Sequence, residues 1–239
     1  MKSRAMHFGE AFLAWARRSA IPLPGSHEQP LSEDARASLG RMIEGKRFVF
    51  LGEPEHCVVE KYPFRLTLIR YLSEHGWRHI SMETGQSTGW RVDRYLETGD
   101  ASWLRALGYE AFSRLTRCPM DIGIQDGSVG SHLHKRFPEQ ILSIWMLYGR
   151  GTLMMPKGPR SVRLHGDTIE SLLAQVGDRF LLPLNDIDPQ AKVILSNANL
   201  RSSWGSYACA NLNAQADAIY FAKHVNAEKK VGTTESRYA

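Results

Sequence analysis

Residues 47–83, RFVFLGEPEHCVVEKYPFRLTLIRYLSEHGWRHISME, decide the fold. They begin with a short apolar run from Arg47 to Gly52, which is typical of a buried strand. Apolar residues at helical spacing then predict a helix from Glu60 to His75, which Gly76 ends. Arg78 to Met82 is expected to be a second strand. A strand, a helix and a strand within about 35 residues predict a βαβ unit with two parallel strands.

The rest of the chain alternates between helical and strand-like patterns. Further helices are expected at residues 5–19, 32–45, 89–98, 101–107 and 168–176, with Asp167 as the N-cap of the last. Further strands are expected at residues 141–148, 179–184, 192–195 and 217–222. Residues 116–134 are polar and glycine-rich and show little periodicity. The alternation predicts an α/β fold with a mostly parallel central sheet flanked by helices, in a single domain over residues 1–239.

Composition narrows the class of protein. The chain has 239 residues, of which 43% are hydrophobic and 23% charged, which excludes disorder as the dominant state. The formal net charge is +5, but the basic residues are scattered and form no nucleic-acid recognition motif. No apolar run reaches the ~18 residues of a membrane span, and residues 1–20 lack the apolar core of a signal peptide. The three cysteines are widely spaced and predict no disulfide framework, so we expect a cytoplasmic protein. From the charge pattern and the apolar runs, we expect neither nucleic acid nor a membrane as its partner.

Four residues that could take part in catalysis lie on the predicted βαβ unit or directly after its strands. The first strand leads directly into Glu53 and His56, and the second leads into Glu83. Parallel strands end at the same edge of a sheet, where binding residues collect. Arg65 lies on the connecting helix, and its side chain should lean toward the amino end of that helix. We therefore expect these four side chains to converge on one strand edge.

The four groups together suit acid–base catalysis. An imidazole can take a proton from water at neutral pH, and a neighbouring carboxylate fixes its tautomer and stabilises the imidazolium. An arginine can hold a second carboxylate ionised or stabilise an oxyanion. Each residue also has a simpler interpretation. Glu53 precedes a proline, as in many turns or helix caps, and Arg65 could pair with Glu60 at the surface.

These residues resemble the erythromycin esterase family, which includes proteins labelled as succinoglycan biosynthesis proteins. The family has a strand ending in Gly-Glu-x-x-His, then a Glu and an Arg-rich helix, a second strand ending in Glu, and an Asp-x-Tyr-x-x-x-Gly run. The matching residues here are Gly52, Glu53, His56, Glu60, Arg65, Arg70, Glu83, Asp93, Tyr95 and Gly99. The resemblance implies a hydrolase of the same fold in which His56 activates a water that attacks an ester carbonyl, such as that of a macrolide lactone. Glu53, Arg65 and Glu83 would complete the pocket, with a small-molecule ester as the partner and neither a cofactor nor a metal ion.

The sequence departs from the family in two places. The long helical middle section of the family is largely missing around residues 130–140. A second histidine motif, His-Asn-x-His, is expected after a later strand, but the corresponding residues here are Tyr148-Gly149-Arg150-Gly151-Thr152. His132 and His134 could compensate, although their polar surroundings predict plain surface residues.

Two alternatives to the esterase interpretation stay open. The first is a ligand-binding relative without catalytic activity, which kept the fold but lost the second histidine motif. The second is a metal-dependent hydrolase, because Glu53, His56 and Glu83 are ligand types that suit zinc or manganese. No compact motif such as His-Glu-x-x-His supports the metal interpretation.

Overall fold

The computed structural model describes residues 2–52, 58–80, 86–105, 129–155, 158–201 and 207–227. The chain divides into two units, one made of Met1–Arg70 and Gly123–Ala239 and the other of Tyr71–Ile122. The first unit contains the central sheet, and the described helices α4 and α5 belong to the second. No helix in the described ranges is both long and apolar enough to cross a bilayer.

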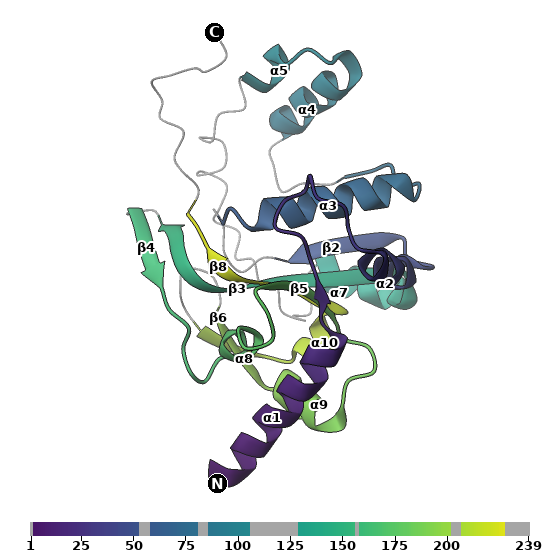
Figure 1. Ribbon diagram of the computed structural model, residues 1–239. Helices are drawn as coiled ribbons and strands as arrows, with labels where there is room; N and C mark the ends of the chain where they lie inside the picture. The colour runs from purple at the N-terminus through teal and green to yellow at the C-terminus, as the bar shows by residue number, and fades with distance from the viewer. Residues whose placement is uncertain are drawn as a thin grey trace. The chain divides into compact units, whose positions relative to one another are not determined.

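The first unit is built on a six-stranded mixed sheet (Figure 1). Its strands are β1 (Ile21–Pro22), β2 (Phe48–Gly52), β3 (Ile141–Met155), β4 (Gly158–Val162), β5 (Arg179–Pro183) and β8 (Ala218–Val225). The order is β1-β5-β8-β3-β2, and β4 pairs with the far end of β3. Strand β3 is parallel to β2 and β8, whereas the pairs β1–β5, β5–β8 and β3–β4 are antiparallel.

The α/β class is therefore confirmed, but the expectation of a mostly parallel sheet is wrong. Three of the five strand pairs are antiparallel. One cause is visible in the sequence: only Pro156 and Lys157 separate β3 from β4. A connection this short can only join antiparallel strands, since a parallel crossover needs a dozen or more residues. The parallel part is limited to β2, β3 and β8.

Helices and a small hairpin complete the first unit. They are α1 (Lys2–Ser19), α2 (Glu33–Ile43), α3 (Lys61–Glu74, whose last four residues belong to the second unit), α7 (Val129–Arg136), the short 3-10 helix η1 (Pro138–Gln140), α8 (Ile169–Leu173), α9 (Pro189–Ser196), α10 (Leu212–Gln215) and the antiparallel pair β6 (Ala198–Arg201) and β7 (Tyr207–Ala210).

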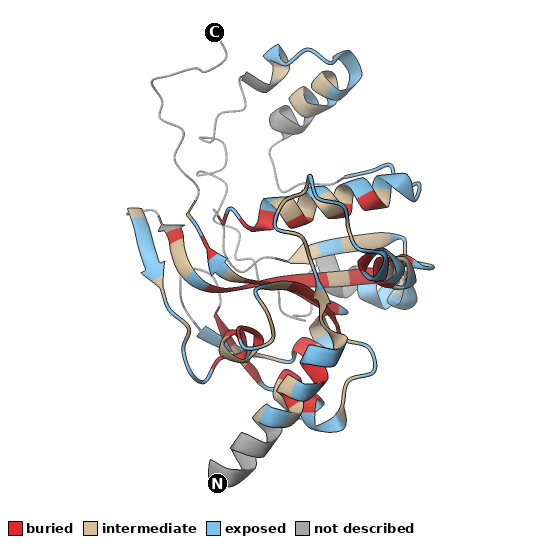
Figure 2. Cartoon of the chain, in the orientation of Figure 1, coloured by how far each residue is buried: buried red, intermediate tan, exposed pale blue. Residues whose placement is uncertain are grey.

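The main hydrophobic core lies between one face of the sheet and helices α1, α8, α9 and α10. Trp145 and Leu147 of β3 face this core, where Phe12 and Trp15 of α1 also lie. Figure 2 shows the buried residues concentrated along β3, β5 and β8 and on these helices. On the other face of the sheet, the ring of Phe64 in α3 stacks on that of Tyr220 with centroids 4.3 Å apart.

Most of the expected elements are confirmed, including α1, α2, β2, α3, α4, α5, α8, β5 and β8. The expected strand at residues 192–195 is wrong, because that segment lies in α9. Asp188 caps this helix by accepting a hydrogen bond from the Gln190 N–H, and Pro189 occupies its first turn. These start signals outweigh the β-branched pair Val193-Ile194.

Three further expectations differ from the structure. Residues 78–80 of the expected second strand are not in a strand, and 81–82 lie outside the described residues. Helix α7 occupies part of the stretch in which no element was expected. Thr168, not Asp167, is at the N-cap position of α8. Asp167 instead binds His165 and Asn199, with O···N distances of 2.6 and 3.2 Å, because these polar partners compete with the helix terminus for its carboxylate.

The second unit contains α4 (Gln86–Thr98) and α5 (Ser102–Arg105). Trp90 and Trp103 pack edge to face with centroids 5.2 Å apart. Gly99 follows α4 with a φ of 69°, and its N–H donates to the carbonyl of Tyr95. The Asp-x-Tyr-x-x-x-Gly run thus consists of the second half of this helix and the glycine that ends it.

Candidate functional site

The candidate site begins where β2 ends. Gly52 is the last residue of β2 and is paired with Trp145 of β3. A Cβ at Gly52 would lie 3.4 Å from the indole ring of Trp145, so a small residue suits this close approach. Because β2, β3 and β8 are parallel, their carboxyl ends share one edge of the sheet. The sequence Glu53 to His56 continues directly from that edge.

Glu60 fastens the start of α3 to the end of β8. Its carboxylate accepts hydrogen bonds from the backbone N–H and the side-chain amide of Asn226, at 2.9 and 2.8 Å. The hydroxyl of Tyr220 donates to the Glu60 carbonyl at 2.8 Å, and the Val59 N–H donates to the Asn226 carbonyl. Glu60 is only 6% exposed. These contacts hold the amino end of α3 at the carboxyl edge of the parallel strands.

Arg65 is the one predicted site residue inside the described part of the chain. It is half-buried on α3, next to the buried Phe64 and one turn beyond Lys61. It lies in the first turns of α3, the helix whose amino end is anchored at the strand edge. Glu53, His56 and Glu83 lie outside the described residues. The convergence of the four side chains, and the use of three of them as metal ligands, therefore remain predictions.

The sequence analysis did not assign a role to Glu60 beyond a surface partner for Arg65. Its role is structural, because a buried carboxylate with two charge-assisted hydrogen bonds holds two segments together. The sequence carries only a weak signal for this role, a carboxylate just before the first turn of α3. Its partner Asn226 is 166 positions away, and only the fold brings the two together.

A second buried carboxylate lies on α8, on the face of the sheet opposite α3. Glu170 of α8 accepts a hydrogen bond from the Arg201 N–H at 2.8 Å, and burial raises the pKa of this carboxyl. The guanidinium of Arg201 donates to the carbonyls of Tyr148 and Gly149. Near this pair, a hydrogen bond from His165 lowers the pKa of the exposed Asp167. The Glu170–Arg201 contacts join α8 and β6 to β3, and Asp167 joins the segment before α8 to β6 through Asn199. In the described ranges no three His, Cys, Asp or Glu side chains group as metal ligands.

The place expected for the second histidine motif lies inside β3. Residues Tyr148 to Thr152 continue the strand, pairing first with β8 and then with β4. They contain no histidine, but Arg150 is paired with His224 of β8. No local sequence pattern predicts this pair, since register between distant strands is set by the fold. His134 is exposed on α7, as expected of a surface residue.

Comparison with known proteins supports the fold. The sequence matches no family model and no curated protein. Its structure is similar to that of a succinoglycan biosynthesis protein, with a TM-score of 0.73 and 14% identity, over 92% of this chain and 98% of the other. A Bacillus cereus protein matches with a TM-score of 0.73 and 12% identity, over 91% and 98%. A mutant of the erythromycin esterase EreC in its open conformation matches with a TM-score of 0.60 and 15% identity, over 85% and 97%. The chain therefore has an erythromycin esterase-like fold.

Proposed function

We propose that the protein is an esterase-like hydrolase in which His56 acts as the general base. One observation supports this more than any other: the chain shares its fold with an erythromycin esterase over 85% of its length. The Gly-Glu-x-x-His run of the resemblance then begins at the last residue of β2. The proposed substrate is a small-molecule ester, with a macrolide lactone as the first candidate.

Each proposed residue has one task in the reaction. His56 takes a proton from water, and the hydroxide adds to the ester carbonyl carbon. The carbonyl oxygen becomes an oxyanion, which the guanidinium of Arg65 stabilises. Collapse of the tetrahedral intermediate breaks the bond to the alcohol oxygen, and the His56 imidazolium returns its proton to that oxygen. Glu53 and Glu83 orient the imidazole and stabilise its charged form.

The test is hydrolysis of a macrolactone and of a simple aryl ester by the full chain. His56→Ala should lower kcat/KM by about 10²–10⁴, the usual contribution of a general base. His134→Ala is the matched control, because this histidine is exposed on α7, and it should leave the rate unchanged. Equal rates for wild type and His56→Ala would refute the proposal. Loss of activity with a chelator, restored by zinc or manganese, would favour the metal-dependent alternative.

A second candidate is a ligand-binding relative that does not catalyse hydrolysis. It is favoured by the absence of histidine from Tyr148 to Thr152, where the structure has a continuous strand. This candidate predicts saturable binding of the lactone, measured by calorimetry, with no product after prolonged incubation. Turnover that depends on His56 would exclude it.

A further inference from the structure

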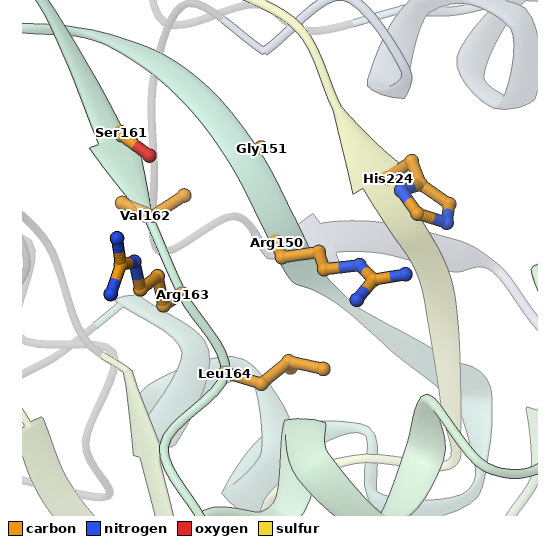
Figure 3. Close-up of a pocket in the computed structure, with 7 residues that line it drawn as sticks. All are labelled: Arg150, Gly151, Ser161, Val162, Arg163, Leu164 and His224. Carbon is orange, nitrogen blue, oxygen red and sulfur yellow. The ribbon is translucent and has the colours of Figure 1, made fainter.

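A pocket of about 550 Å³ lies beside the carboxyl halves of β3 and β8, where the segment after β4 passes them (Figure 3). It is lined by Arg150, Gly151, Ser161, Val162, Arg163, Leu164 and His224. Its volume is within the range of small-molecule sites. The site residues proposed above are not among the residues that line it.

The ionisable side chains that line this pocket are all basic. Two arginines and a histidine line it, and none of the described residues around it is acidic. Arg150, Arg163 and His224 are exposed, and within the described part of the chain none of their side chains forms a hydrogen bond or ion pair. In contrast, Arg94 pairs with Glu97 at 2.7 Å, and Lys223 pairs with Asp178 at 3.4 Å. Unpaired cations around a concave surface create a positive potential that attracts anions.

The backbone sets Arg150 and His224 next to each other. Arg150 and His224 are register partners on adjacent parallel strands, so their backbones are ~4.8 Å apart and their side chains share a face of the sheet. In Figure 3 the guanidinium of Arg150 extends toward β8, from which His224 projects. Arg163 lies on the other side of the pocket, and its guanidinium points away from Arg150. Gly151 also lines the pocket.

We propose that this pocket binds the phosphoryl group of a small-molecule phosphate monoester. Arg150 and His224 contact the phosphoryl oxygens, and Arg163 adds positive charge from across the pocket. A phosphate monoester carries about twice the negative charge of a carboxylate, so the positive charge of Arg150, with that of Arg163 farther away, favours the phosphate. The remaining volume accommodates the organic part of the ligand. The inference is independent of the hydrolase proposal, because binding at this pocket requires no turnover.

The experiment is a titration of the full chain with inorganic phosphate, phenyl phosphate and benzoate at constant ionic strength. Binding is followed by the NMR signals of the His224 ring and the Arg150 side chain. Phenyl phosphate should bind more tightly than benzoate, and inorganic phosphate should displace it. Arg150→Gln should weaken binding by about 10- to 100-fold, the loss expected for a charge-assisted contact. Arg163→Gln should weaken it less, because its guanidinium points away.

Arg160→Gln is the matched control, since Arg160 is exposed on β4 but does not line the pocket. It should change the dissociation constant by less than about two-fold. Each variant is first shown to unfold at the same denaturant concentration as wild type. Unchanged binding in Arg150→Gln, equal losses in Arg150→Gln and Arg160→Gln, or equal affinity for benzoate and phenyl phosphate would each overturn the proposal. Absence of phosphate binding by the wild type would also overturn it.

Discussion

The two halves of β3 have different roles. From Ile141 to Tyr148 the strand is almost entirely buried and pairs with the parallel strands β2 and β8. From Gly149 to Met155 it carries the exposed Arg150, pairs with β4 and borders the cationic pocket. A single strand thus supplies the core in its first half and a binding surface in its second.

The boundary between the halves is marked by a buried arginine. Arg201 is 5% exposed, and its guanidinium donates hydrogen bonds to the carbonyls of both Tyr148 and Gly149. Glu170 in turn accepts a hydrogen bond from the backbone of Arg201. Satisfying these carbonyls at the point where the strand leaves the core avoids the free energy of burying them without partners. Packing therefore stabilises residues 141–148 of β3 (the core half), whereas the contacts of Arg201 satisfy the backbone where residues 149–155 (the site half) begin.

The largest expected effect tests the core half. Leu147 is fully buried in the main hydrophobic core, so Leu147→Ala should lower the free energy of unfolding by about 2–5 kcal/mol. The lost methyl groups no longer contact the core, and a cavity remains. Denaturant unfolding measures the change. Val193→Ala is the control, because Val193 is 49% exposed on α9, and it should cost less than about 1 kcal/mol. Equal effects of the two variants would contradict the proposed role of the first half.

The next effect tests the backbone of the site half. Gly151 has a φ of 145°, and a Cβ at this position would overlap the carbonyl oxygen of Val225 in β8. Gly151→Ala should therefore lower the free energy of unfolding by about 2–3 kcal/mol, through strain and steric overlap. Gly166→Ala, at a position with open space and no positive φ, should change it by less than about 0.5 kcal/mol. A neutral Gly151→Ala would show that the two strands can separate here without loss of stability.

The fold was predictable where short-range patterns agree with the final packing. The apolar runs of β2, β5, β8 and the first half of β3 identify buried strands, and the apolar spacing of α1 and α3 identifies helices. Helix α9 was missed because Val193 and Ile194 favour strands, whereas the decisive signals, Asp188 and Pro189, precede them. The mixed sheet was missed because strand order depends on contacts between distant segments.

The candidate site was predictable only in part, for the same physical reason. Arg65 could be placed from the helix alone, since its position depends on spacing within α3. The Glu60–Asn226 contact and the Arg150–His224 pair join residues 166 and 74 positions apart. The fold brings the first pair together, and the register of the sheet brings the second together. Local sequence carries no signal for such pairs.

A smaller effect tests how the carboxyl edge is held. Glu60→Gln removes the negative charge that strengthens two hydrogen bonds from Asn226. It also replaces one acceptor oxygen with an NH2 group, which cannot accept the hydrogen bond. The free energy of unfolding should fall by about 1–2 kcal/mol, and the amide of Asn226 should exchange faster with solvent. Glu28→Gln, at an exposed residue, is the control. If exchange at Asn226 is unchanged, the contact does not hold α3 to β8.

The smallest expected effect concerns the boundary between the two halves of β3. It is a change in how steeply the free energy of unfolding varies with pH. Burial raises the pKa of Glu170 above its ordinary value of 4.5, so between 4.5 and the raised pKa the folded state binds more protons than the unfolded state. The contribution of Glu170 to stability is therefore complete below pH 4.5, falls as pH rises through this window, and is constant above it. One proton limits the slope to about 1.4 kcal/mol per pH unit.

Glu170→Gln keeps an acceptor for the Arg201 N–H but has no proton to lose, so its stability relative to wild type should increase with pH from 4.5 upward. Urea unfolding of both proteins at several pH values measures the difference. Parallel curves would mean that Glu170 ionises as easily in the folded as in the unfolded chain, and that the boundary at Tyr148 and Gly149 is held without a protonated carboxyl beneath it.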